Sequence, residues 1–179
     1  DETTLLWNVG SGAWDLAAPN WKGQLFGVLM PFFNGANVIF DKTAGGTITI
    51  PSAVFPLTTT VSATSGTYTF SGGPIASGSL IKDGGGRLNI DGLVSGSGTV
   101  VQNTYSGGTI MNSGTLHLGA MFEGISPLCT GVLGTGPVTL GIGTTIEFDR
   151  VTATNALISN GGTLYSQNGW GVTWSGPIT

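Results

Sequence analysis

Short stretches of alternating polar and apolar residues recur along the chain, and most of them follow a Gly or a Gly-Gly step. Residues 109–111 form one such stretch and residues 115–118 the next, separated by a small-residue corner that ends at Gly114. In the second stretch, Leu116 and Leu118 alternate with more polar neighbours at the two-residue period of a half-buried strand. Strands this short cannot each bury an apolar face, so neighbouring copies must stack, which predicts a repeat fold.

The corners between the strands favour one kind of repeat fold. Many corners are Gly-Gly or Asn-Ser-Gly, and the strands are only about three to five residues long, which suits a chain that turns within one coil and pairs in parallel with the next. Charged residues make up 8% of the chain and Gly accounts for 32 of 179 residues, a composition that argues against long surface helices. We therefore predict an all-β, right-handed parallel β-helix (β-solenoid), with a β-sandwich as the runner-up.

We assign residues 37–179 to the solenoid. Pro51 and Pro56 predict an irregular coil with edge character at residues 57–61. Residues 120–132 are expected to form a loop or short helical insertion, and the end of the chain echoes residues 66–75, so the repeats are expected to continue beyond residue 179. The expected strands lie at residues 37–41, 46–50, 66–70, 78–82, 86–90, 98–102, 109–111, 115–118, 136–140, 143–148, 156–158 and 162–165.

The first 36 residues differ from the rest because they are rich in tryptophan. Trp7, Trp14 and Trp21 are evenly spaced, but Gly and Pro residues between them rule out a continuous helix. We expect turns and short strands that cap the open end of the solenoid core, since an uncovered terminal coil invites edge-to-edge association. The alternative is that the three indole rings contact a ligand as a platform on which sugars stack.

Composition excludes several classes of partner. The net charge is −4 and the five Lys and Arg residues are scattered singly, so no basic patch can neutralise a row of phosphates, and nucleic acid is not an expected partner. No run of eighteen or more apolar residues is present, so we expect no direct membrane insertion by this section. Cys129 is the single cysteine and is expected to be a small buried apolar residue.

Titratable side chains offer few candidates for catalysis. His117 has the parity opposite to Leu116 and Leu118, so it is expected to face outward as part of the scaffold, with no Ser-rich elbow or neighbouring carboxylate to suggest a triad. Glu147 and Asp149 lie two apart in one expected strand and hence on one face, the arrangement that a glycoside-cleaving pair or a cation site uses. We favour an outward polar face here, so no metal and no cofactor are predicted.

A polysaccharide lyase built on a β-helix needs carboxylates that hold Ca²⁺ and a basic residue that acts on the sugar. We consider turn chemistry the better explanation for the nearest candidates, because they stand in or beside Gly-rich corners. These candidates are Asp83, Asp91, Lys82 and Arg87.

Three consecutive segments carry a family resemblance. Residues 78–90 read Gly-Ser-Leu-Ile-Lys-Asp-Gly-Gly-Gly-Arg-Leu-Asn-Ile, residues 103–109 read Asn-Thr-Tyr-Ser-Gly-Gly-Thr, and residues 112–119 read Asn-Ser-Gly-Thr-Leu-His-Leu-Gly. Together they resemble the autotransporter passenger-associated strand repeat, apart from inserted residues at 92–102 and 120–132. The residues that match the motif, and that we expect to be structural, are Tyr105, Gly107, Gly108, Thr109, Gly114, Thr115, Leu116, Leu118 and Gly119.

The resemblance implies a secreted or surface-displayed β-helix, a section of a longer passenger in a Gram-negative envelope. It implies no single activity, because such helices serve as stalks, adhesins and carriers of other domains. We therefore expect a non-enzymatic extracellular structural section, a stalk or adhesin, with a glycan or protein of the host surface or matrix as partner, or self-association through the solenoid ends. The alternative is a polysaccharide-binding or polysaccharide-cleaving module, a lyase or hydrolase.

Overall fold

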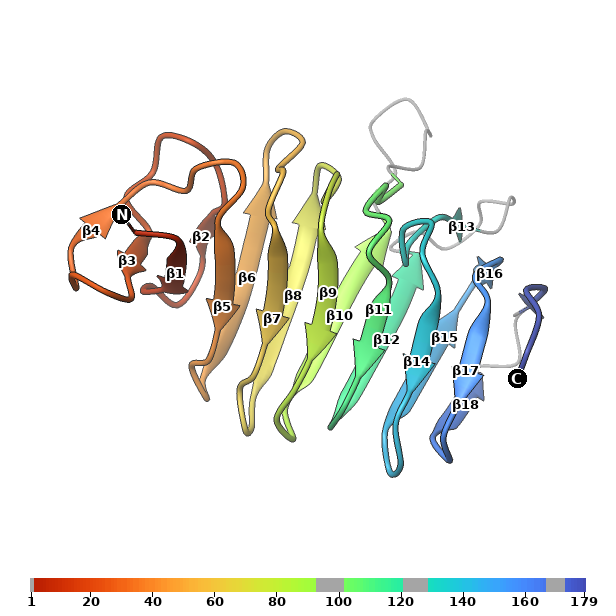
Figure 1. Ribbon diagram of the computed structural model, residues 1–179. Helices are drawn as coiled ribbons and strands as arrows, with labels where there is room; N and C mark the ends of the chain where they lie inside the picture. Colours follow the sequence, from red (N-terminus) through yellow and green to blue (C-terminus); the bar gives the residue numbers. More distant parts are fainter. Residues whose placement is uncertain (1, 93–101, 121–128, 167–172) are drawn as a thin grey trace.

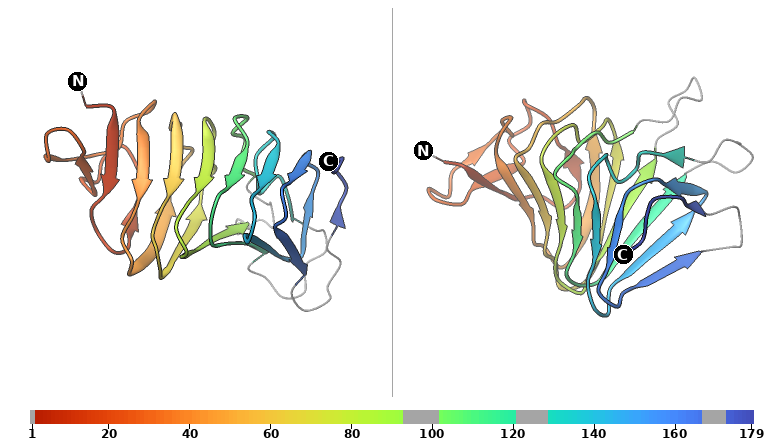
Figure 2. Two further views of the ribbon diagram at one scale, coloured as in Figure 1. Left: turned by 60° about the horizontal axis from the view of Figure 1, so that its bottom comes forward. Right: turned by 45° about the vertical axis from the view of Figure 1, so that its right-hand side comes forward.

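The computed structural model describes residues 2–92, 102–120, 129–166 and 173–179. These residues contain strands and no helix, and they stack as the coils of a parallel β-solenoid, as the sequence predicts. Each coil descends along a strand of one sheet, turns at the lower corner and returns along a strand of a second sheet (Figure 1). Figure 2 shows the coils following one another along a single axis from the N-terminus to the C-terminus. No helix in the described ranges is long and apolar enough to span a membrane.

The described strands form two large sheets and a small one. Sheet A has nine strands, in the order β17-β14-β11-β9-β7-β5-β1-β3-β4: β1 (Thr4–Trp7), β3 (Trp21–Gly23), β4 (Leu29–Met30), β5 (Asn37–Phe40), β7 (Thr58–Val61), β9 (Ser79–Lys82), β11 (Thr109–Met111), β14 (Val138–Leu140) and β17 (Leu157–Ser159). Sheet B has seven, in the order β18-β15-β12-β10-β8-β6-β2: β2 (Gly12–Ala13), β6 (Gly45–Ile50), β8 (Thr67–Gly72), β10 (Arg87–Gly92), β12 (Thr115–Ala120), β15 (Thr145–Asp149) and β18 (Thr163–Ser166). The small sheet holds β13 (Cys129–Thr130), β16 (Val151–Ala153) and β19 (Thr173–Trp174).

Residues of the same kind in successive coils lie above one another and form columns. In sheet B, Leu88, Leu116 and Ile146 are paired in succession, and all three are 0% exposed. Each such side chain contributes about 1.5 to 3 kcal/mol when it is fully buried. The core is therefore a continuous set of apolar ladders, in which each coil covers the apolar surface of the coil before it.

The corners between sheets A and B require glycine. Gly114 has a φ of +77°, and a Cβ built there would lie 2.5 Å from the carbonyl oxygen of Gly84 in the preceding coil. A side chain at this position would therefore be strained in its backbone and would collide with its neighbour. The predicted Gly corners thus serve both to turn the chain and to let two coils approach closely.

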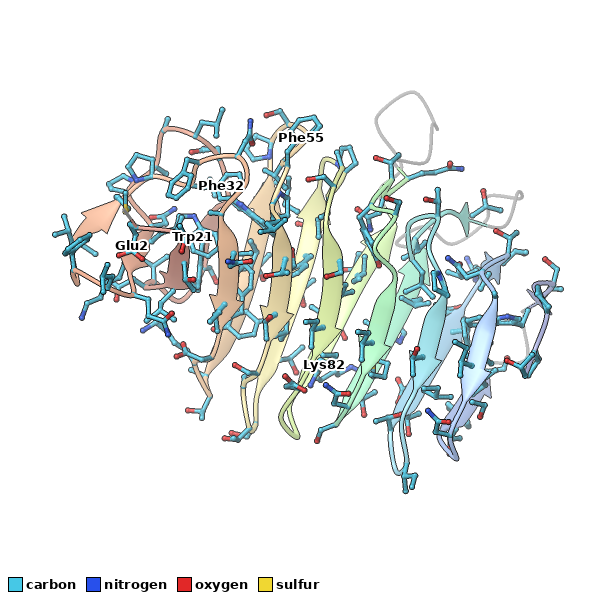
Figure 3. All side chains as sticks on the ribbon, in the orientation of Figure 1. Glu2, Trp21, Phe32, Phe55 and Lys82 are labelled. Atoms are coloured by element: carbon cyan, nitrogen blue, oxygen red, sulfur yellow. The ribbon has the colours of Figure 1, made fainter. Side chains whose placement is uncertain are left out.

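The tryptophan-rich start closes the N-terminal end of the core with an aromatic cluster. The ring centroids of Trp7 and Trp21 lie 4.9 Å apart and those of Trp14 and Trp21 lie 5.6 Å apart, in the edge-to-face arrangements that aromatic pairs prefer. Trp21 and Phe32 are labelled at this end in Figure 3. The strands β1 and β2 already pair with β5 and β6, so the first coil lies within the 36 residues that we assign to the cap.

Two details of the coils differ from the sequence-based expectation. Residues 57–61 were expected to have edge character, but β7 is an interior strand of sheet A, between β5 and β9. Pro51 and Pro56 lie outside the strands and so do not interrupt the ladder. The small third sheet was not predicted, because strands of two or three residues are too short to show a period.

The inserted residues lengthen the coils without breaking the register. Thr58 hydrogen-bonds Asn37, 21 residues earlier, whereas Asn103 donates to the carbonyl of Val132, 29 residues later. Most of the insertion at 120–132 and most of the strand expected at 98–102 lie outside the described residues. The pairing of β10 with β12 and of β12 with β15 shows that the sheet continues past both insertions.

Candidate functional site

The outer face of sheet B gathers charged side chains from three successive strands. Asn89 of β10, His117 of β12 and Glu147 of β15 are paired residue by residue, and Arg87 stands two positions before Asn89 on the same face. The inward parity of Leu116 and Leu118, both 0% exposed, confirms that His117 points outward. We call Arg87, His117 and Glu147 the ionic cluster.

Arg87 joins two coils that are not neighbours. Its Nη2 donates to Oε2 of Glu147 at 2.5 Å, and its Nε donates to Oδ1 of Asn89 at 2.7 Å. Since β12 lies between β10 and β15, the Arg87 and Glu147 side chains together bridge two strand spacings, about 10 Å. His117 Nδ1 lies 3.5 Å from the same Glu147 oxygen, so a carboxylate does stand beside the histidine, contrary to the expectation from the sequence, because the register of β12 and β15 pairs the two residues.

The electrostatics of the cluster do not suit general acid–base catalysis. The hydrogen bond from Arg87 holds the pKa of Glu147 below its usual value, despite opposition from partial desolvation, and His117 adds to the lowering. Burial raises the pKa of the nearby Asp91, while His117 opposes that rise. A catalytic base works best with a pKa near the working pH, so the shift at Glu147 is in the wrong direction for that role.

Glu147 and Asp149 share the outer face, as their spacing predicts. Glu147 is engaged by Arg87, and Oδ1 of Asp149 lies 3.9 Å from Nε of Arg150. Within the described ranges, no three His, Cys, Asp or Glu side chains come together to hold a metal ion. The two carboxylates therefore serve as partners of neighbouring arginines in this structure.

The tryptophans are placed for packing and not for contact with a ligand. Trp7, Trp14 and Trp21 are 1%, 0% and 0% exposed, so their rings have no free face on which a sugar could stack. An exposed aromatic ring occurs instead at Tyr165, which is 53% exposed and paired with Glu147 at the end of the outer column. Sequence reasoning did not single out Tyr165, because its strand alone does not show which column it joins.

Lys82 is the buried cation of the fold. It is 0% exposed, and its Nζ donates to the backbone carbonyls of Asp83 and Gly84, each at 2.8 Å, and of Ser113 at 3.3 Å. Burial lowers its pKa to about 8, with Asp83 acting against the shift. The alternation of the strand places Lys82 on the same inward side as Leu80, so the sequence does indicate a buried lysine. A lysine at the end of a strand is nevertheless normally expected to face solvent.

The two aspartates considered for a lyase site do not meet. Asp83 accepts a hydrogen bond from the Asn112 side chain at 2.7 Å, across a corner between coils. Asp91 lines a small, partly open cavity of about 20 Å³, together with Asn103 and apolar side chains. That volume is of the order of one water molecule and cannot admit a sugar ring.

The residues that match the repeat motif occupy structural positions. The hydroxyls of Tyr105 and Thr109 hydrogen-bond at 2.7 Å inside the core, and burial raises the pKa of Tyr105. A Cβ at Gly107 or Gly108 would lie 2.6 Å from a carbonyl oxygen of a neighbouring coil. Gly119 leaves room for the His117 imidazole, whose Nε2 would lie 2.9 Å from an added Cβ.

Comparison with models of protein families finds no match to the chain, and no curated protein or solved structure matches it significantly. The resemblance to the autotransporter strand repeat therefore stays a prediction from the sequence.

Proposed function

We propose that the chain is a non-enzymatic structural section of a secreted or surface-displayed protein of autotransporter type, acting as a stalk or part of an adhesin. The observation that carries this proposal is the register of buried columns along the described strands, in which each interior coil pairs with the one before and the one after. Such an assembly is stiff along its axis, and it presents outer side chains at a fixed spacing of about 4.8 Å per coil. A spacer or a repeated contact surface needs these properties.

The structural role is tested by removing one coil. Ser79 pairs with Thr58, and Arg87 pairs with Thr67, so deletion of residues 58–78 brings the next coil into the same register. We expect this variant to fold, with a β-type circular dichroism spectrum and a cooperative melt. Deletion of residues 58–73 is the matched control, because it removes part of a coil and shifts the register. Equal loss of folding in both variants would contradict the modular stalk.

Surface display is tested separately on the cells that produce the protein. Antibodies raised against the chain should bind intact cells, and added protease should remove the epitope without lysing them. An epitope that becomes accessible only after lysis would contradict display.

A second candidate function is binding of an acidic or neutral polysaccharide along the outer face of sheet B. The exposed ring of Tyr165, at the end of the column of polar side chains formed by Asn89, His117 and Glu147, favours it, because an aromatic face packs against sugar rings and polar side chains hydrogen-bond sugar hydroxyls. A glycan array probed with the chain and with its Tyr165→Ala variant tests this candidate. Absence of binding by the unmodified chain would remove it.

A further inference from the structure

The outer face of sheet A carries an uncharged stripe, and we propose that this face binds the same face of a second copy of the chain. The stripe is the outward column formed by Ile39, Thr60, Ile81, Ile110, Thr139 and Ile158, which are paired in succession from β5 to β17. Ile110 and Ile158 are 36% and 43% exposed. We call this column the isoleucine stripe.

Alternation in the strands assigns the column to the outside. In β5, β7 and β9 the burial pattern alternates in step, so the residues on either side of Ile39, Thr60 and Ile81 are those that enter the core. The stripe residues are all β-branched and form one continuous ridge. Such a ridge on the outer face of a sheet is the kind of surface that packs against another sheet.

The distribution of charge favours a second copy as the occupant. The outward positions of β5, β7, β9, β11, β14 and β17 hold no charged side chain, and the single charged residue in those strands, Lys82, is buried in the core. Sheet B instead carries Arg87, Glu147 and Asp149 on its outer face. Two copies of net charge −4 can therefore approach through these six strands of sheet A without placing like charges opposite each other.

The periodicity of the stripe points to the same partner. Its side chains repeat every 4.8 Å or so, and a surface that matches this period is the outer face of another parallel solenoid. Because the same patch is used on both chains, the contact can be two-fold symmetric and closed.

The stripe is small, so we expect the association of two copies to be weak. From Leu6, the preceding member of the column, to Ile158 the stripe covers about 29 Å by 10 Å, well under the roughly 800 Å² per partner of a standard interface. Beyond Leu6 the column reaches the exposed and charged Lys22 of β3, so the uncharged stripe ends at Leu6. We expect a dissociation constant on the order of 0.1 mM for the free chain. Dense display on a surface would raise the effective concentration.

This inference builds on the proposed structural role, and it is tested on the purified chain alone. Sedimentation equilibrium should show reversible association as the concentration rises to about 1 mM. Ile110→Lys places a charge at the centre of the stripe and should weaken association at least about tenfold. Thr49→Lys adds the same charge to an exposed position of β6 in sheet B and should associate like the unmodified chain. Both variants should keep the circular dichroism spectrum and melting temperature of the unmodified chain, and Thr139→Lys replaces Ile110→Lys if that variant misfolds.

Three results would overturn the inference and leave the proposed stalk untouched. The first is a monomer at every concentration. The second is association that survives Ile110→Lys but is lost in Leu164→Lys, at the partly exposed end of sheet B, which would indicate stacking through the solenoid ends. The third is a monomeric chain that binds phosphatidylcholine vesicles and loses that binding in Ile110→Lys, which would indicate a lipid-facing surface.

Discussion

Lys82 and Ser113, 31 residues apart in the sequence, are joined where two coils turn from sheet A to sheet B: Nζ of the buried lysine donates to the serine carbonyl at 3.3 Å. The same ammonium also binds the carbonyls of Asp83 and Gly84 in its own coil. Its three donors thus match three acceptors, which compensates part of the cost of burying a charge. The corner is held by a cation, although the surrounding ladders are apolar.

Replacement of Lys82 by methionine should destabilise the fold. Methionine fills a similar volume but leaves three partly buried carbonyl groups without their donor, which should cost about 1 to 3 kcal/mol of unfolding free energy. The measurement is urea denaturation followed by circular dichroism. Lys22→Met is the matched control, because Lys22 is exposed in β3 and its loss should leave the midpoint unchanged. Equal midpoints for the two variants would show that the three hydrogen bonds from Lys82 to backbone carbonyls do not stabilise the fold.

The pH dependence of stability should also report on Lys82. Its folded pKa of about 8 is below the value of 10.5 for a free lysine, so the unfolded chain holds this proton more tightly between those values. Its contribution to stability should therefore rise as the pH increases from about 8 to 9.5, by at most about 1.4 kcal/mol per pH unit. Thermal melts across this window should show the rise in the unmodified chain and not in Lys82→Met. A parallel response of the two proteins would assign the effect to other groups.

The Glu2 carboxylate should stabilise the β3–β4 hairpin through hydrogen bonds that weaken when the carboxylate is protonated. Its carboxylate accepts the backbone amides of Leu25 at 2.9 Å and Phe26 at 3.2 Å (Figure 3 labels Glu2). Desolvation acts to raise its pKa, but the amides of Phe26, Leu25 and Thr4 together lower it. A lowered acid pKa stabilises the fold above the unfolded value and loses that effect as the pH falls through the folded one.

We therefore expect amide hydrogen exchange at Leu25 and Phe26, after correction for the intrinsic rate, to accelerate below about pH 4. Glu2→Gln should show fast exchange at neutral pH as well, since a neutral amide is a weaker acceptor for two backbone donors. Exchange in Glu2→Gln that is as slow as in the unmodified chain at pH 7 would show that the Glu2 carboxylate does not protect these amides.

The inward and outward parity of β12 predicts unequal effects for two neighbouring residues. Leu116 is 0% exposed in the middle of a buried column, so Leu116→Asp places an unpaired carboxylate there and should unfold the surrounding coils. His117 faces outward, and His117→Ala should change the unfolding free energy by less than about 1 kcal/mol. Thermal melting of both variants gives the comparison. Similar losses would contradict the parity of this strand.

The alternation and the Gly corners were sufficient to predict the solenoid, because both are local properties of a single coil. The parities of Leu116 and His117 followed from one strand read alone. The ionic cluster could not be found in this way, since the bridge from Arg87 to Glu147 depends on the register across three strands. The separation between paired residues of neighbouring coils varies from 18 residues between β15 and β18 to 36 residues between β2 and β6, so no fixed period in the sequence aligns these two positions. The burial of Lys82 is hard to predict for a different reason, because its charge favours an exposed side chain whereas its parity in the strand favours a buried one.

The bridge between Arg87 and Glu147 should couple two coils that share no backbone hydrogen bonds. A double-mutant cycle with Arg87→Met, Glu147→Gln and the double variant should give a coupling free energy of about 1 kcal/mol at pH 7, toward the upper end for partly exposed pairs. The pKa of Glu147 is lowered in the folded chain, so the coupling is complete above the unfolded pKa of about 4.3 and should decline as the pH falls through the folded value. Added salt should weaken the coupling only modestly, because the Glu147 side chain is 17% exposed. A coupling near zero at pH 7 would mean that the buried columns alone stabilise the solenoid and that the outer face of sheet B contributes nothing through this pair. The expected value would instead show that Arg87 stabilises the contact between β10 and β15 across β12.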